Sequence, residues 1–216
     1  MRKYVEHTLL KQDAVQNEVK KILDEAVKYG FLGVCVNPCN VKYAKQYLKE
    51  TGGSDVKVVT VVGFPLGQNT TEIKILETID AIKNGADEID MVLNVGRLKD
   101  SDDAYIVNEI AGVKMACQGK NLKVILETDL LTSDEIKRAC ELCIKGGADF
   151  VKTSTGFVKN GVGAKVEDVK LMYETVKDAG LKVKASGGIR DKETAAKMIE
   201  AGASRLGTSS GVAIVS

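Results

Sequence analysis

The amino-acid sequence predicts an α/β protein that forms a (β/α)8 barrel as a single domain over residues 1–216. Short apolar runs alternate with stretches of helical periodicity from one end of the chain to the other. No Gly-, Pro- or Ser-rich linker interrupts this alternation, and a length of 216 residues suits one such barrel. A doubly wound open sheet is the alternative, but no G-x-G-x-x-G motif follows the first predicted strand.

The first half of the chain contains four predicted strands, each followed by a predicted helix. Apolar residues at helical spacing mark the first helix, and the β-branched run KVVTVVG marks the third strand. The predicted strands are Tyr4–Leu9, Phe31–Asn37, Lys57–Gly63 and Glu88–Asn94. The predicted helices are Ala14–Tyr29, Val41–Glu50, Thr71–Asn84 and Asp102–Gln118.

The second half of the chain continues the same alternation. A capping box of Thr132 and Glu135 predicts the start of the helix that follows the fifth strand. The other predicted elements are strands Leu122–Glu127, Phe150–Ser154, Val183–Ser186 and Arg205–Thr208, and helices Val166–Ala179 and Lys192–Ala201. A glycine able to take a left-handed C-cap recurs between helix and strand in the segments Asn84–Asp87, Lys145–Asp149 and Glu200–Ser204.

Charge and hydropathy exclude several classes of partner. The net charge of +1 favours neither nucleic acid nor an anionic membrane surface. No apolar run approaches the roughly 20 residues that cross a bilayer, and the apolar stretch at the N-terminus is too short and broken for a signal peptide. We therefore expect a cytoplasmic protein that binds neither nucleic acid nor membrane.

The cysteines and the single histidine limit the chemistry. Five cysteines without a secretion signal argue against a disulfide framework. Cys140 and Cys143 form a C-x-x-C, but the surrounding sequence is helix-periodic, so we interpret them as residues of a helix face. His7 alone cannot supply a multi-histidine metal site, and we interpret it as structural. We expect neither a metal nor a cofactor.

Two lysines stand where buried strands should end. Lys152 lies inside the apolar run of DFVKTSTGF. Burying a lysine in such a strand costs free energy, so we expect it to be paired with an opposite charge or to serve a function. Lys184 occupies the same position in LKVKASGGIR. Barrel active sites lie at the carboxyl ends of the strands, and strand alternation can direct both lysines and Asp90 into the interior.

These three residues support two interpretations with equal force. A dry interior and a neighbouring ammonium both disfavour the protonated form of a lysine, so Lys184 can turn Lys152 into a nucleophile, with Asp90 moving protons. Alternatively, the lysines are structural ions paired with Asp90 or Glu127, because structural networks also perturb titration.

The last two strands end in turns that suit phosphate. Barrels often bind phosphate in the loops after strands seven and eight. Here those loops contain Gly187–Gly188 and the run Gly207-Thr-Ser-Ser210, and Ser209–Ser210 can open a final helix. The alternative is that these are ordinary turn residues.

The motifs HTLL, GFPLG, EIDMVLNVG, KVILET, DFVKTSTGF, VKASGGIR and RLGTSSG, in this order over nearly the whole chain, resemble the deoxyribose-phosphate aldolases. That family is a class I aldolase on a (β/α)8 barrel, which joins acetaldehyde and glyceraldehyde 3-phosphate reversibly into 2-deoxy-D-ribose 5-phosphate without a metal. The resemblance implies a sugar phosphate and small aldehydes as partners. Barrels of this kind often associate, so we expect a homodimer or homotetramer.

The resemblance also implies roles for individual residues. Lys152 matches the lysine that forms the Schiff base, Lys184 the lysine that perturbs it, and Asp90 the carboxylate that transfers protons. The residues that match the surroundings of substrate and phosphate are Thr155, Gly156, Gly187, Gly188, Gly207, Ser209 and Ser210. Cys35 matches a cysteine near the substrate in some members, and Lys123 matches a further active-site lysine.

The chain departs from the family pattern in two places. Glu6 stands where the family usually has an aspartate before His-Thr, and the sequence ends at Ser216 without the C-terminal tyrosine that assists proton transfer in some longer members. Three rivals remain: a Schiff-base aldolase for another phosphorylated sugar, a non-catalytic barrel that binds phosphorylated metabolites, and a zinc-dependent aldolase. The single histidine disfavours the last.

Overall fold

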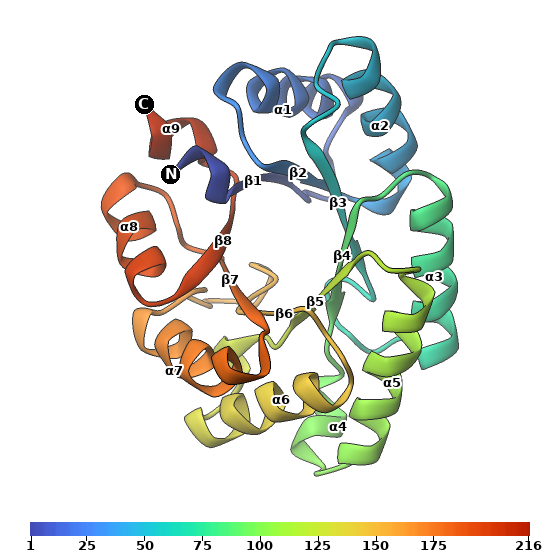
Figure 1. The fold of residues 1–216 in the computed structure, drawn as a ribbon, viewed down its shortest axis with the longest axis vertical. Helices are drawn as coiled ribbons and strands as arrows, with labels where there is room; N and C mark the ends of the chain where they lie inside the picture. The colour runs from blue at the N-terminus through green and yellow to red at the C-terminus, as the bar shows by residue number, and fades with distance from the viewer.

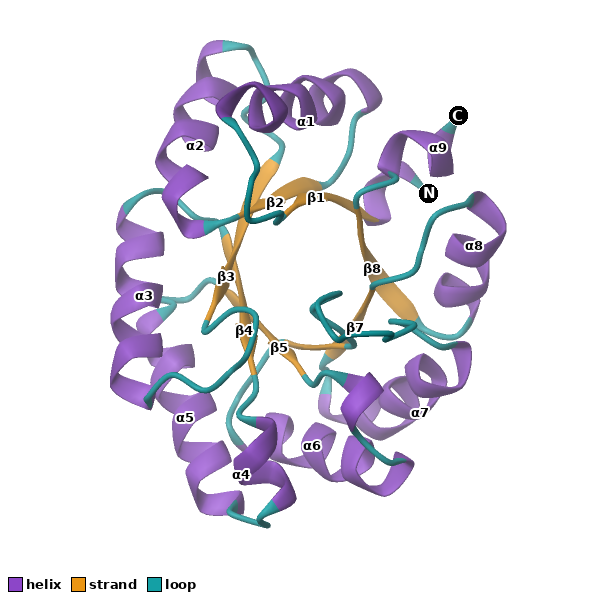
Figure 2. Ribbon diagram, turned by 180° about the vertical axis from the view of Figure 1, so that it is seen from behind, coloured by secondary structure: helices purple, strands orange, loops and turns teal.

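A computed structural model describes residues 1–216 and shows a closed barrel of eight parallel strands in chain order, with the helices outside it (Figure 1; Figure 2). The predicted fold class is confirmed. The strands are β1 (Val5–Leu9), β2 (Gly33–Val36), β3 (Lys57–Val62), β4 (Glu88–Val92), β5 (Asn121–Ile125), β6 (Phe150–Lys152), β7 (Lys182–Ser186) and β8 (Ala203–Thr208). Pairing of β1 with β8 closes the ring.

Every predicted helix is present. The helices are α1 (Gln16–Tyr29), α2 (Val41–Glu50), α3 (Thr71–Lys83), α4 (Val95–Lys99), α5 (Asp103–Ala116), α6 (Ser133–Lys145), α7 (Val166–Val176), α8 (Lys192–Glu200) and α9 (Gly211–Val215). Short 3₁₀ turns cover Arg2–Tyr4, Pro38–Asn40, Thr128–Leu130 and Lys177–Ala179.

Two helices differ from the prediction. The helix predicted over Val166–Ala179 ends at Val176 and continues as a 3₁₀ turn. The additional helix α4 starts where the Asn94 side chain accepts a hydrogen bond from the Arg97 N–H at 3.1 Å. Five residues are too few to produce a visible helical period, so only the capping asparagine could have indicated α4.

Local signals at the helix ends behave as expected. Thr132 Oγ1 accepts from the Glu135 N–H at 3.3 Å, and the Glu135 carboxylate accepts from the Thr132 N–H at 2.8 Å, which confirms the capping box. Gly85 has a φ of 105°, in the left-handed region predicted for it. Asp87, two residues later, accepts from the Val58 N–H of β3 at 2.9 Å. This hydrogen bond ties the turn after α3 to the start of the neighbouring strand β3.

The core lies between the strands and the helices, where a continuous cluster of 45 buried apolar residues packs. His7 points into this layer: its Nε2 lies 2.7 Å from Glu25 Oε2 of α1, and its ring packs against Phe31. Cys140 and Cys143 are buried on α6, and burial raises the pKa of the Cys140 thiol to about 12. The structural interpretations of these residues are confirmed. No helix has both the length and the hydrophobicity needed to cross a membrane.

Candidate active site

Five charged side chains from five strands point into the barrel interior. They are Glu6 of β1, Asp90 of β4, Lys123 of β5, Lys152 of β6 and Lys184 of β7, and all are buried. The strand register places Lys123 beside Asp90 and Lys152 beside Lys184. Alternation along each strand therefore brings distant parts of the sequence together in the barrel interior, and we call these five residues the charged floor.

Asp90 is the hub of the charged floor. Lys152 Nζ donates to Asp90 Oδ2 at 2.8 Å, and Lys184 Nζ donates to the same oxygen at 2.6 Å. Lys123 Nζ donates to Asp90 Oδ1 at 2.9 Å. Lys184 also donates to Glu6. The two lysines singled out from the sequence therefore meet at a single carboxylate oxygen, as expected from their strand positions.

A third carboxylate, that of Glu88, balances the charges below this hub. Glu88 Oε2 lies 2.7 Å from Lys123 Nζ, and Glu88 Oε1 lies 2.5 Å from Lys57 Nζ at the lower edge. An unpaired charge in such a dry interior costs several kcal/mol, so partners of opposite sign are required. Lys123 and Glu88 form the layer that supports the hub from beneath.

The network fixes the ionisation of its members. Burial opposes ionisation of Asp90, but the positive charges of Lys123, Lys152 and Lys184 outweigh burial and hold the pKa of Asp90 well below its usual range. Burial also lowers the pKa of Lys184, but Asp90 and Glu6 raise it above its usual value. Asp90 is thus an anion, and Lys184 a cation, throughout the neutral range.

A cavity of about 350 Å³ opens above the charged floor, at the carboxyl ends of the strands. Lys152 alone among the floor residues lines it, with 3% of its surface exposed. The other predicted residues that line this cavity are Thr155, Gly156, Gly187, Gly188, Gly207 and Ser209. The structure thus brings the predicted nucleophile and most of the predicted phosphate residues around one space.

The remaining predicted residues do not line the cavity. Asp90 and Lys184 lie beneath it, and Lys123 lies a layer lower. Cys35 packs beside Leu10 in a small apolar cluster, and burial raises the pKa of its thiol to about 11. Ser210 occupies the N-cap position of α9, which confirms the predicted final helix. Substrate contacts by Lys123, Cys35 and Ser210 stay predictions.

Backbone conformation shapes the rim of the cavity. Gly187 and Gly188 have φ values of 85° and 75°, which favour glycine. At Gly207, a Cβ atom would lie 2.9 Å from Cε of Lys184. Glycine at this position therefore makes room for the side chain of Lys184.

Sequence reasoning gave no firm role to several residues at the cavity. Glu127 does not line the cavity but supports Thr155, which does. It has a φ of 62°, is buried, and accepts from the Thr155 N–H at 3.0 Å and from its hydroxyl. Burial raises the pKa of Glu127. Arg190 and Lys11 stand at the rim as cations. The only sequence signals were the position of Glu127 at a strand end and of Arg190 at the end of SGGIR.

Comparison with known proteins assigns the family. The family model described as DeoC/LacD family aldolase matches residues 3–216. The chain belongs to this family. It is 55% identical over 215 residues to the deoxyribose-phosphate aldolase of Finegoldia magna, covering 100% of this chain and 98% of that protein. It is 57% identical over 215 residues to the deoxyribose-phosphate aldolase of Brevibacillus brevis, covering 100% and 95%.

Solved structures agree with this assignment. The deoxyribose phosphate aldolase of Aeropyrum pernix, described as a unique tetrameric structure, superposes with a TM-score of 0.89. The two chains are 33% identical, with 98% of this chain and 88% of that chain covered. The similarity extends over the whole barrel, so it includes the strands that form the charged floor.

Proposed function

We propose that this aldolase cleaves 2-deoxy-D-ribose 5-phosphate reversibly to acetaldehyde and D-glyceraldehyde 3-phosphate through a Schiff base on Lys152. The observation that carries the proposal is the position of Lys152, whose amine shares the carboxylate of Asp90 with Lys184 and lines the cavity. The curated relatives at 55% and 57% identity are named for this activity.

The first step is attack of the Lys152 amine on the aldehyde carbon of the open-chain sugar. The amine must be neutral to attack, and it lies beside Lys184 at the oxygen of Asp90 that the two lysines share. One proton passes from the nitrogen to the carbonyl oxygen to give a carbinolamine, and a second proton, taken up from solvent, lets that oxygen depart as water. The Asp90 carboxylate or a water molecule relays these protons. The product is a protonated imine.

The protonated imine then acts as the electron sink. The C3 hydroxyl loses its proton, the bond between C2 and C3 breaks, and its electron pair forms an enamine on Lys152. Glyceraldehyde 3-phosphate leaves as an aldehyde. Protonation of the enamine at C2 and hydrolysis of the imine release acetaldehyde and restore the amine.

The rim holds the phosphate in this proposal. Gly187, Gly188 and Gly207 bring backbone close to the cavity, Ser209 adds a hydroxyl, and Arg190 adds a cation. The loops after β7 and β8 occupy the position where barrels often bind phosphate. Thr155 and Gly156 complete the wall above Lys152.

We place this activity in the cytoplasm, where charged sugar phosphates are retained, in a single catalytic domain over residues 1–216. We also propose that the chain self-associates as a homodimer or homotetramer; the tetrameric relative from Aeropyrum pernix supports this.

Turnover by the purified chain tests the proposed reaction. Acetaldehyde release should be rapid with 2-deoxy-D-ribose 5-phosphate, slow with ribose 5-phosphate and fructose 1,6-bisphosphate, and unaffected by EDTA. Preference for another sugar phosphate would indicate a different Schiff-base aldolase. Loss of activity with EDTA would indicate zinc chemistry, and tight binding without turnover would indicate a binding protein.

A further inference from the structure

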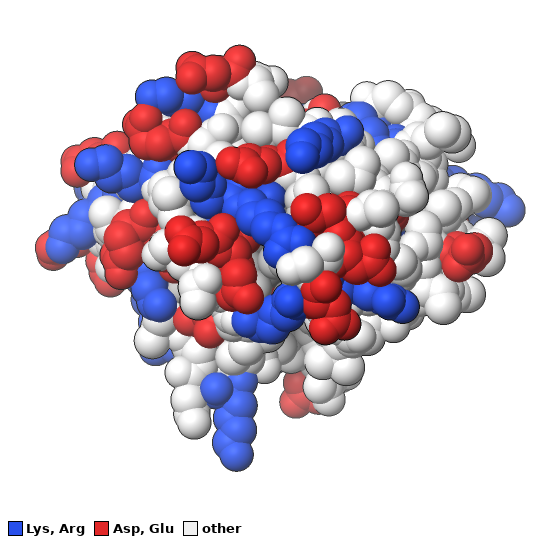
Figure 3. All heavy atoms as spheres, turned by 90° about the horizontal axis from the view of Figure 1, so that it is seen from below, with Lys and Arg blue, Asp and Glu red and all other residues white.

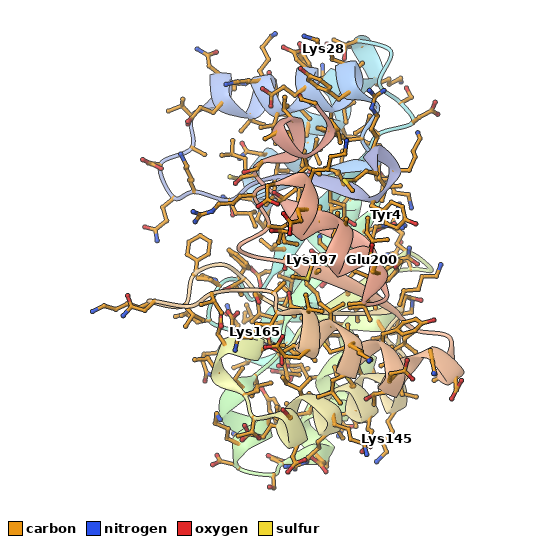
Figure 4. The ribbon with its side chains drawn as sticks, turned by 90° about the vertical axis from the view of Figure 1, so that its left-hand side faces the viewer. Tyr4, Lys28, Lys145, Lys165, Lys197 and Glu200 are labelled. Carbon is orange, nitrogen blue, oxygen red and sulfur yellow. The ribbon has the colours of Figure 1, made fainter.

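The longest connection at the carboxyl ends of the strands is the segment of residues 153–165, between β6 and α7. It contains neither helix nor strand, and Gly161 and Val162 in it are exposed. In Figure 4, a pale orange coil of this part of the chain projects from the barrel just above Lys165, the residue before α7. An exposed coil has few apolar contacts, so its position depends on the hydrogen bonds that it makes.

The carboxylate of Asp129 holds the middle of this segment. Its Oδ2 accepts from the Gly163 N–H at 2.8 Å, and its Oδ1 accepts from the Val162 N–H at 3.3 Å. A Cβ on Gly161 would lie 2.7 Å from Oδ2, so the carboxylate packs directly against the backbone of the turn. Asp129 therefore binds three consecutive residues through their backbone.

Asp129 is itself attached to the barrel. It lies in the 3₁₀ turn Thr128–Leu130, which follows β5. The N–H of Thr128, a buried residue, donates to the carbonyl of Thr153 at the end of β6 at 3.0 Å. The carboxylate is therefore presented to the coil from a fixed base.

The residues held by Asp129 pack against the Gly187–Gly188 turn after β7. The Ala164 N–H donates to the Gly187 carbonyl at 3.1 Å. A Cβ on Gly163 would lie 2.4 Å from the carbonyl carbon of Gly187, and one on Gly188 would lie 2.5 Å from the carbonyl oxygen of Val162. The two backbones touch with no side chain between them, so a shift of one must move the other.

Gly187 and Gly188 also line the cavity, and their N–H groups donate to no other group of the chain. Successive free N–H groups in a left-handed turn form a concavity that suits an anion. A continuous series of contacts thus runs from Asp129 through Gly163 to the N–H groups that we assign to phosphate.

We propose that Asp129 is a positioning residue for phosphate recognition: it fixes residues 162–164, and these hold Gly187 and Gly188 in the conformation that binds the phosphate of the substrate. This role rests on the proposed function, which places the phosphate at this rim. Asp129 does not line the cavity and so acts through the coil. It thereby determines how strongly the chain prefers a phosphorylated sugar over the same sugar without phosphate.

A purely electrostatic role of Asp129 would have the opposite sign. Loss of a negative charge near an anion site should strengthen binding of the anion. Figure 3 shows acidic and basic side chains interspersed on the side of the barrel where α4 and α6 lie in Figure 1, so removal of one carboxylate there changes the long-range field little. The sign of the effect therefore separates a hydrogen-bonding role from an electrostatic one.

Steady-state kinetics with 2-deoxy-D-ribose 5-phosphate and with 2-deoxy-D-ribose test the proposal. Asp129→Ala should raise KM for the phosphorylated sugar by roughly tenfold, the equivalent of one hydrogen bond, with little change in kcat. For the unphosphorylated sugar, kcat/KM should stay within about twofold of the wild-type value, because Lys152 and the rest of the charged floor are unchanged. An equal loss with both sugars would overturn the proposal, because it would indicate a general distortion of the cavity.

Two further variants separate the hydrogen bonds of Asp129 from its charge. Asp129→Asn is neutral but keeps one acceptor oxygen for the Gly163 N–H, so its KM should lie close to that of the wild-type chain. Asp134→Ala removes an exposed carboxylate of α6 as a matched control and should leave both sugars unaffected. A lower KM in both Asp129→Ala and Asp129→Asn would show that Asp129 acts through its charge and would overturn the proposal.

Binding of inorganic phosphate, measured by isothermal titration calorimetry, distinguishes failure of this role from failure of the proposed reaction. Asp129→Ala should bind phosphate roughly tenfold more weakly than the wild-type chain. If the wild-type chain binds phosphate without turning over the sugar phosphate, the same loss in Asp129→Ala would support the positioning role while the proposed reaction fails. An unchanged phosphate affinity in Asp129→Ala would overturn the positioning role and leave the aldolase proposal intact.

Discussion

The charged floor and the rim of the cavity are constructed in different ways. On the floor, Asp90 joins three lysines from three strands, and every charge is buried and paired. At the rim, Gly187 and Gly188 present backbone in the left-handed region, and Arg190 stands exposed. Changes on the floor should therefore alter the chemical step and the stability of the barrel, whereas changes at the rim should alter the affinity for substrate.

The largest effect on the floor should come from Lys152→Leu. Without the amine no Schiff base forms, so we expect kcat to fall by at least about a thousandfold. Lys145→Leu, at an exposed site on α6, is the matched control and should retain full activity. Both are measured by acetaldehyde release, and substantial turnover by Lys152→Leu would contradict the assigned nucleophile.

A smaller loss is expected for Lys184→Met. This change removes the cation that shares the Asp90 oxygen with the reacting amine, so kcat should fall by roughly a hundredfold. The pH–rate profile should also shift towards higher pH, because the positive charge of Lys184 no longer acts on the reacting amine. A lower rate with an unchanged profile would mean that Lys184 only fills space.

Lys123→Met should act on the stability of the barrel. It leaves Asp90 and Glu88 without a shared cation, which should cost about 3–5 kcal/mol of unfolding free energy. The wild-type pKa of Glu88 is lowered to about 2 by Lys123 and Lys57, against the effect of burial, and the pKa of Asp90 is also depressed. Stability from such carboxylates is present above their unfolded pKa and is lost as pH falls through the folded pKa.

Without Lys123 the folded pKa values of both carboxylates rise, so the loss of stability should begin at a higher pH. Urea denaturation between pH 3 and pH 8 measures this shift. Parallel curves for the variant and the wild-type chain, offset by a constant free energy, would show that Lys123 does not set these pKa values.

The smallest effect should come from a residue that supports the rim. Glu127 fixes the backbone and hydroxyl of Thr155, and Glu127→Gln replaces one acceptor oxygen by a donor. We expect KM to rise by roughly tenfold, the equivalent of one hydrogen bond, with little change in kcat. Steady-state kinetics measure both constants. A large fall in kcat with constant KM would show that Glu127 acts in the chemical step, as the charged floor does, and not in substrate binding.

Much of the floor could be predicted from local sequence, because strand alternation alone directs Asp90, Lys152 and Lys184 inward. The contact between Glu6 and Lys184 could not, since these residues are 178 positions apart and meet only when β1 closes on β8. The pairing of Lys123 with Glu88 does not depend on this closure, because it joins the neighbouring strands β5 and β4.

The rim was predictable in position but not in detail. The pair Gly187–Gly188 and the run Gly207-Thr-Ser-Ser210 indicated ligand loops, yet only the three-dimensional structure shows that Gly207 makes room for Lys184. The left-handed backbone of Glu127 has no local sequence signal, because a glutamate rarely adopts that conformation.

Borohydride reduction in the presence of acetaldehyde, followed by intact mass measurement and peptide mapping, tests the central claim most directly. We predict one reduced two-carbon adduct per chain, on Lys152, and none in Lys152→Leu. An adduct on Lys184 would keep the class I reaction but reverse the roles of the two lysines. The absence of any adduct in a chain that still binds sugar phosphate would contradict the account.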